Sequence, residues 1–166
     1  LPTWLEGTAL TRGLELPVWI YTLNESFQRA YVVGSATVLG SADEVEAALK
    51  GSTLETLRAT AFLAKQDARG ELPAGAANGT VSRIVPGRDS LTCEGETSGP
   101  GLLVVSNNWD KNWHARVNGV EAPILRCNLA FQAVALPQAG PFRVELEYRN
   151  PVLWWTHAGS VAALLG

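Results

Sequence analysis

The sequence predicts a mainly β protein, an antiparallel β-sandwich with a small N-terminal α/β portion, and three observations lead to this prediction. From residue 80 onward, short runs that alternate apolar and polar side chains are separated by turn residues. Asn118-Gly119 lies between two such runs, and this dipeptide favours a tight hairpin because both turn positions need positive φ. The apolar run at residues 102–106 is typical of a strand that is buried on both faces.

The N-terminal portion, residues 1–79, combines strand and helix patterns. Strands are predicted at residues 18–23, 30–38 and 59–64, where β-branched and aromatic residues gather. Between the second and third strands, Ser41 and Glu44 have the spacing of a capping box, which predicts that a short helix begins here. Gly51 is placed to end that helix. Residues 54–57 are predicted to form a brief turn.

Residues 65–79 are predicted to form a loop. They contain three glycines and a proline but few large apolar side chains. The loop is either a boundary between two domains or a connection within one continuous sheet, so the α/β portion and the sandwich are either two domains or one.

Residues 80–151 are predicted to form the sandwich. Its strands are expected at 81–85, 90–96, 102–106, 113–118, 120–125, 131–136 and 142–148. Pro123 indicates that its strand lies at the edge of a sheet, because proline cannot donate to a neighbouring strand. Strands this short and this regular are typical of sandwiches of the jelly-roll or carbohydrate-binding-module kind.

Residues 152–166 carry no formal charge, with His157 taken as neutral, and begin with the pair Trp154-Trp155 after one valine and one leucine. Paired tryptophans at the head of an apolar run are typical of a membrane interface. The segment is shorter than the ~20 residues that a spanning helix needs, so it is predicted to be the start of a transmembrane helix. The alternative is an apolar tail that packs on the sandwich. Because the chain has no Met, we expect it to be a processed or excised piece of a larger protein.

The composition excludes some classes of function. The net charge is -3 and no basic stripe is visible, which argues against a nucleic-acid partner. The two cysteines, Cys93 and Cys127, fit no zinc-binding spacing. They are candidates for a disulfide in an oxidising compartment, and the alternative is two separate, partly buried thiols.

No catalytic constellation, metal site or cofactor motif is found, so none is predicted. Glu145 and Glu147 share one face of a strand, roughly 6.5–7 Å apart, which is a spacing that glycosidase carboxylates can have. Arg143 and Arg149 share that face as well. A solvated, charged sheet face is therefore the favoured interpretation.

The residues Asn107, Asn108, Trp109 and Asp110 form the candidate ligand-binding cluster. An aromatic plane with amide and carboxylate groups at its edge is an arrangement that can hold a sugar. A purely structural role for the loop is the alternative. Trp113, a few residues later, fits the inward positions of its strand and is predicted to belong to the core.

A recognisable pattern runs through the second half of the chain, in 102–106, the loop ending in Trp113, 117–119, 124–128, Phe131 with Val134, 137–140 and Tyr148. In this pattern the chain resembles the C-terminal, outward-facing domain of the bacterial YfhO-like membrane proteins. Residues 28–34 and the acidic helix at 42–49 fit the same family more loosely. Lys111-Asn112 departs from the Pro-Gly usual there, and Asn107 stands where Asp is common, so the ligand preference of this loop is open.

The resemblance implies a domain on the extracytoplasmic side of the cell membrane, within a multi-pass protein similar to glycosyltransferases that use lipid-linked sugars. The family's catalytic acidic residues match no position here, so the fragment is expected to be non-catalytic. Its expected partners are a cell-surface glycan or cell-wall polymer, which it would recognise or position, and the transmembrane region of its own parent. The alternatives are a free-standing carbohydrate-binding module and a purely structural or adhesive sandwich.

Overall fold

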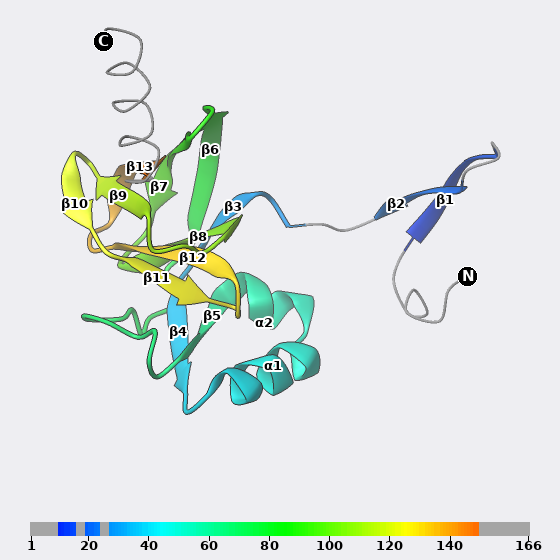
Figure 1. Cartoon of the computed structure of the whole chain (residues 1–166), viewed down its shortest axis with the longest axis horizontal. Coiled ribbons are helices and arrows are strands. Elements are labelled where there is room, and N and C mark those ends of the chain that lie inside the picture. The colour runs from blue at the N-terminus through cyan, green and yellow to red at the C-terminus, as the bar shows by residue number, and fades with distance from the viewer. Residues whose placement is uncertain (1–9, 16–18, 24–26, 150–166) are drawn as a thin grey trace, which may run out of the picture.

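The computed structural model describes residues 10–15, 19–23 and 27–149 of the chain. Strands dominate this part, and the described residues contain two helices (Figure 1). The mainly β prediction is confirmed. Residues 27–149 form an outer layer, a middle layer and a third layer, which are stacked on one another.

The outer layer is a five-stranded antiparallel sheet with the order β10-β9-β13-β7-β6. Its strands are β6 (Gly79–Pro86), β7 (Ser90–Thr97), β9 (Trp113–Val117), β10 (Val120–Ala122) and β13 (Gly140–Tyr148). The predicted hairpin joins β9 to β10, with φ of 50° at Asn118 and 84° at Gly119. The Asn-Gly prediction is therefore confirmed.

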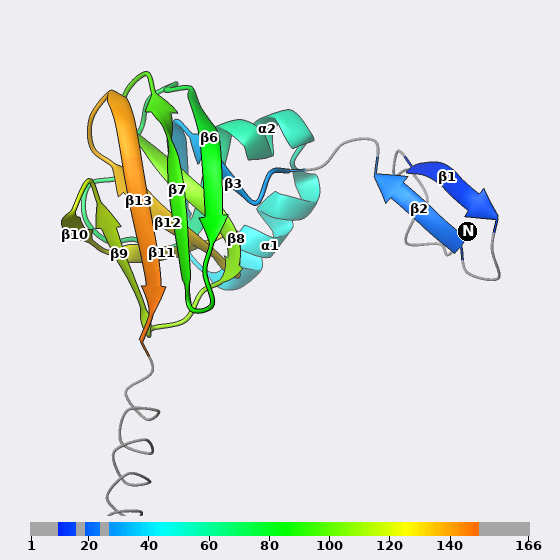
Figure 2. The same cartoon turned by 90° about the horizontal axis from the view of Figure 1, so that it is seen from above.

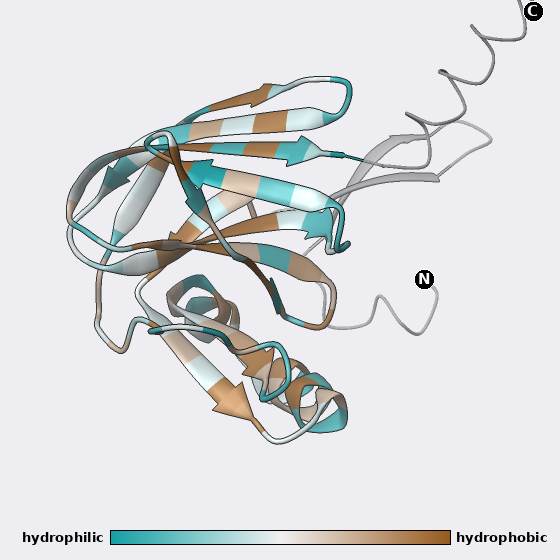
Figure 3. Cartoon of the chain, turned by 60° about the vertical axis from the view of Figure 1, so that its left-hand side comes forward, coloured by the Kyte–Doolittle hydropathy of each residue, from teal (hydrophilic) through white to brown (hydrophobic). Residues whose placement is uncertain are grey.

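The middle layer is a four-stranded antiparallel sheet with the order β11-β12-β8-β3. It contains β3 (Ala30–Val33), β8 (Gly101–Asn108), β11 (Ile124–Cys127) and β12 (Phe131–Leu136). On β8, Leu103 faces the outer sheet and packs with Val144 and Leu146 of β13. Its neighbour Leu102 faces the other way and packs with Leu63. The run at 102–106 is thus buried on both faces from 102 to 105, as the sequence predicts. Figure 3 shows strands with apolar positions between the outer sheet and the helices.

A third layer covers the far face of the middle sheet. It consists of the parallel pair β4 (Ser35–Leu39) and β5 (Thr60–Ala64), which are joined by α1 (Ala42–Gly51) and α2 (Leu54–Ala59) (Figure 1). The Ser41 hydroxyl accepts a bond from the Glu44 amide at 3.2 Å, which confirms the predicted cap. Val45 of α1 packs on Phe62, so the helix covers the face of β5 that the middle sheet does not.

Two predicted strands are each divided between two sheets, and a predicted turn is helical. The strand expected at 30–38 breaks at Gly34, where a Cβ atom would meet the backbone of the loop at 76–77, and its two halves lie in the middle and third layers. The strand expected at 120–125 breaks at Pro123, so that β10 and β11 become edge strands of different sheets, in accord with the edge that proline indicates. The turn expected at 54–57 is part of α2, whose cap is the Thr53 side chain.

Near the N-terminus, β1 (Leu10–Glu15) pairs with β2 (Trp19–Leu23) in an antiparallel hairpin. The predicted start of a transmembrane helix, residues 152–166, lies outside the described residues. Within residues 10–15, 19–23 and 27–149, neither helix has the length and apolarity that crossing a bilayer requires.

Candidate functional site

The four candidate residues lie together where β8 ends and the chain crosses from the middle sheet to the outer sheet. Asn107 and Asn108 are the last residues of β8, and Trp109 and Asp110 follow in the connection to β9. The structure therefore brings the predicted cluster into one loop, residues 107–113.

Two polar side chains of this loop accept hydrogen bonds from other groups of the protein. The Asn107 side-chain oxygen accepts a bond from the Arg29 guanidinium at 3.1 Å. The Asp110 carboxylate accepts a hydrogen bond from the main-chain N–H of Asn112 at 2.8 Å. These bonds fix the loop, and they leave the exposed Asn108 side chain as the amide available to a ligand.

Trp109 is held in place although 36% of it is exposed. Its main-chain N–H donates to the Ala130 carbonyl at 2.7 Å, and its indole N–H lies 3.4 Å from the Ile124 carbonyl. The Arg126 guanidinium lies 5.7 Å from the ring centroid, in cation–π range, and is itself fixed by Asp67 at 2.9 Å. The ring is therefore a pre-positioned apolar plane with one side taken up by an arginine.

Trp113 is predicted to belong to the core, and it is partly buried against that core. It packs against the apolar cluster between the two antiparallel sheets and meets the Tyr148 ring edge-on, with centroids 5.3 Å apart. The Asn112 side-chain amide lies 3.4 Å from the Tyr148 hydroxyl. These contacts attach the loop to the last residues of β13.

Two residues that the sequence did not single out complete the loop's surroundings. Gln132 is fully buried, and its side-chain N–H donates to the Asn108 carbonyl at 3.1 Å, so it supports the loop from inside. The sequence signal that could have singled out Gln132 is a polar residue at an inward position of a predicted strand.

Leu129, in the turn between β11 and β12, is 39% exposed and has φ of 70°. Nothing in the sequence marks it, because leucine rarely adopts positive φ.

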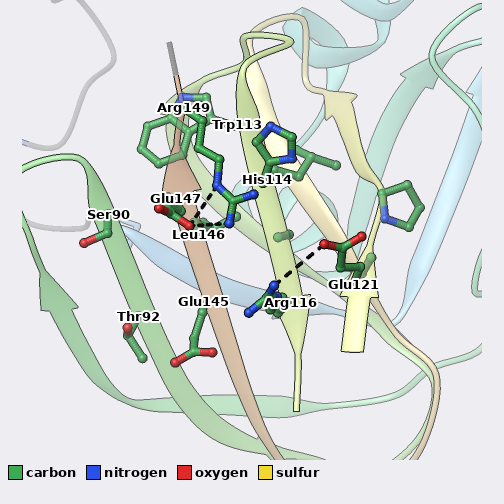
Figure 4. A pocket seen from close by; sticks show the side chains of 14 residues that line it. Ser90, Thr92, Trp113, His114, Arg116, Glu121, Glu145, Leu146, Glu147 and Arg149 are labelled. Atoms are coloured by element: carbon green, nitrogen blue, oxygen red, sulfur yellow. Dashed lines mark hydrogen bonds and ion pairs between the residues drawn. The ribbon is translucent and has the colours of Figure 1, made fainter. Parts of the chain in front are cut away.

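The outer face of the five-stranded sheet holds a shallow cavity of about 710 Å³ (Figure 4). Glu147 is paired with Arg149 at 2.6 Å and Glu145 with Arg143 at 3.0 Å. The hydrogen bond from Arg149 lowers the pKa of Glu147. A carboxylate held ionised by its guanidinium is poorly suited to act as a general acid. The cavity is therefore the solvated, ion-paired face that the sequence indicates.

The two cysteines are free thiols, which corrects the candidate disulfide. Cys93 points into the core between the two antiparallel sheets, whereas Cys127 belongs to the cluster on the opposite face of the middle sheet. A layer of the protein thus separates them. Burial raises the pKa of Cys93 to about 11, against a smaller opposing effect of Arg29, and raises that of Cys127 to about 12.

Both thiols are expected to be unreactive in the folded protein. Thiolates are the reactive form, and pKa values this high leave almost none at neutral pH. With a disulfide reagent such as DTNB, we expect no fast labelling of the native chain and labelling of two thiols after unfolding in guanidinium. Fast labelling of either thiol in the native chain would contradict its burial.

In the part of the chain that the structure describes, no three His, Cys, Asp or Glu side chains come together as a metal site would require. Comparison of the chain with protein-family models, with curated proteins and with solved structures gives no match.

Proposed function

We propose that this chain is a non-catalytic, extracytoplasmic domain of a membrane glycosyltransferase-like protein of the YfhO-like kind, and that it recognises or positions a cell-surface glycan through residues 107–113. The observation that carries the proposal is the fixed and partly exposed plane of Trp109, which directly follows the exposed Asn108 in the chain. The sequence resemblance supplies the membrane setting.

A fixed aromatic ring suits a weakly binding sugar ligand for an energetic reason. Ordering a side chain on binding costs about 0.5–1.5 kcal/mol, and a ring that is already held by neighbours avoids most of that cost. The contacts to Ala130, Ile124 and Arg126 hold Trp109 in this way. The apolar C–H face of a sugar would stack on the exposed part of the ring, and Asn108 would bond its hydroxyls.

The test is a glycan array followed by calorimetric titration with the best-bound glycan. We expect Trp109→Ala to weaken binding about tenfold or more, as truncation of a central aromatic contact does. The matched control is Val120→Ala, which removes another exposed apolar side chain, 71% exposed, from the outer sheet. Its binding should equal that of the wild type.

Absence of binding to any glycan, or equal binding by Trp109→Ala and wild type, would refute the glycan role. A structural sandwich would then be the better account, and one observation favours it already, because Asn107 and Asp110 are bonded within the protein. The membrane setting has a separate test, the sequence of the intact gene. Apolar spans before Leu1 and after Gly166 are expected, and their absence would refute it.

A further inference from the structure

One end of the sandwich is a continuous surface built from segments far apart in the sequence. Main-chain bonds join Trp109 to Ala130 at 2.7 Å, the chain at 149 to Asn112 at 2.9 Å, and Tyr148 to Asp89 at 2.8 Å. The surface, here called the loop end, therefore consists of residues 87–89, 107–113, 128–130 and 148–149. Figure 2 shows the β6–β7 turn and the end of β13 at this same end of the outer sheet.

The loop end combines exposed apolar and basic side chains. Trp109 and Leu129 are two of the large apolar residues that the described chain exposes, at 36% and 39%. Beside them, Lys111 is exposed and has no ion-pair partner among the described residues. The Arg88 side chain, in the β6–β7 turn, is 97% exposed and lies 4.0 Å from Asp89. A combination of apolar and basic groups is typical of proteins that rest on anionic lipid headgroups.

Leu129 is the least expected of these residues. Its φ of 70° is disfavoured for any side chain with a Cβ atom, and 39% of the residue stays exposed, so its burial within the protein is incomplete. Neither backbone preference nor core packing explains a leucine at this position. Contact with an apolar environment outside the described chain would explain it.

The path of the chain leads to the same end. The last described strand, β13, finishes at Tyr148 beside residues 89 and 112, within the loop end. The sequence that follows, residues 152–166, is uncharged and begins with apolar residues and two tryptophans. A membrane that received this segment would face the loop end.

We propose that the loop end docks on an anionic membrane surface, with Leu129 and Trp109 at headgroup depth and Lys111 and Arg88 against lipid phosphates. This inference rests on the membrane setting of the proposed function and extends it, because a glycan on Trp109 would then be read close to the bilayer. The chain as a whole has a net charge of -3, whereas the loop end carries Arg88, Lys111 and Arg149 against Asp89 and Asp110. An anionic surface would therefore repel most of the molecule, and the loop end is a part that it would not repel.

The experiment measures binding of the full chain to phosphatidylcholine vesicles with and without phosphatidylglycerol, by flotation. Residues 152–166 are present in every variant, so differences report the loop end alone. We expect Leu129→Gly to weaken binding about tenfold, since it removes an inserted apolar side chain. Glycine suits the positive φ, so the substitution adds no backbone strain and the variant should fold.

Lys111→Gln should weaken binding to the anionic vesicles about fivefold at low salt. Its matched control is Gln138→Glu, which changes the net charge by the same amount but lies in the β12–β13 turn, at the other end of β8. Equal losses for these two variants, or wild-type binding by Leu129→Gly, would overturn the docking surface. The vesicle experiment contains no glycan, so its failure would not count against glycan binding. The glycan titration tests the proposed function separately.

Discussion

Leu102→Ala and Leu103→Ala are each expected to lower the free energy of unfolding by about 2–5 kcal/mol. The two leucines are neighbours on β8 and both are 0% exposed. Successive residues of a strand point to opposite faces of its sheet. A loss of this size at both positions therefore requires that both faces of the middle sheet are covered, one by the outer sheet and the other by β5.

The outer sheet supplies the matched control. Leu146 of β13 is 1% exposed and faces the core, whereas the side chain of its neighbour Glu145 is 43% exposed and faces solvent. Leu146→Ala should cost as much as the β8 variants, but Glu145→Ala should cost less than about 1 kcal/mol, the upper range for an exposed ion pair. Urea denaturation followed by tryptophan fluorescence measures all four. A small loss at Leu102 alone would mean that the α/β layer does not pack on the sandwich.

The strands were predictable because their patterns are local. Alternating side chains, the Asn-Gly turn and the apolar run on β8 each follow from a few consecutive residues, and each has its expected place in the structure. The capping residue Ser41 is local in the same sense. None of these features depends on which strands become neighbours.

The division of strands between sheets could not be predicted in this way. At Gly34 and at Pro123 the chain passes from one sheet to another while its alternation of side chains continues almost unbroken. What breaks the first strand is the backbone at 76–77, which approaches Gly34 from a loop more than forty residues later in the sequence. Sequence pattern alone does not contain such a contact.

The loop that carries the candidate residues was predictable from the sequence, but the hydrogen bonds that these residues make were not. The sequence placed Asn107 and Asp110 beside Trp109, and the structure does so too. Their partners are another matter, because Arg29 reaches Asn107 from the start of β3. Leu129 had no local signal, since its exposure and positive φ come from the way the β11–β12 turn is attached to Phe62 by Asn128, at 2.8 Å and 2.9 Å.

Gly95→Ala is expected to destabilise the protein by about 3 kcal/mol, a large effect for the addition of one methyl group. Gly95 lies on β7, where it pairs with Phe142 of β13 on one side and with Val81 of β6 on the other. The register between β6 and β7 shifts directly after Val81. A Cβ atom there would overlap the Thr80 carbonyl oxygen and lie 2.7 Å from the Phe142 ring. Because one of these neighbours is backbone, no rotation of a side chain relieves the overlap.

The control is the same substitution where space is free. At Gly51, the last residue of α1, no atom lies within 4 Å of the position that a Cβ atom would take, and alanine favours a helix by up to about 1 kcal/mol over glycine. Gly51→Ala should therefore unfold at the same urea concentration as the wild type or a higher one, and Gly95→Ala at a much lower one. Adding Phe142→Leu to Gly95→Ala should not restore stability, since the Thr80 oxygen remains. Recovery in the double variant would show that β6 can move away from β7 and that the ring alone sets the limit.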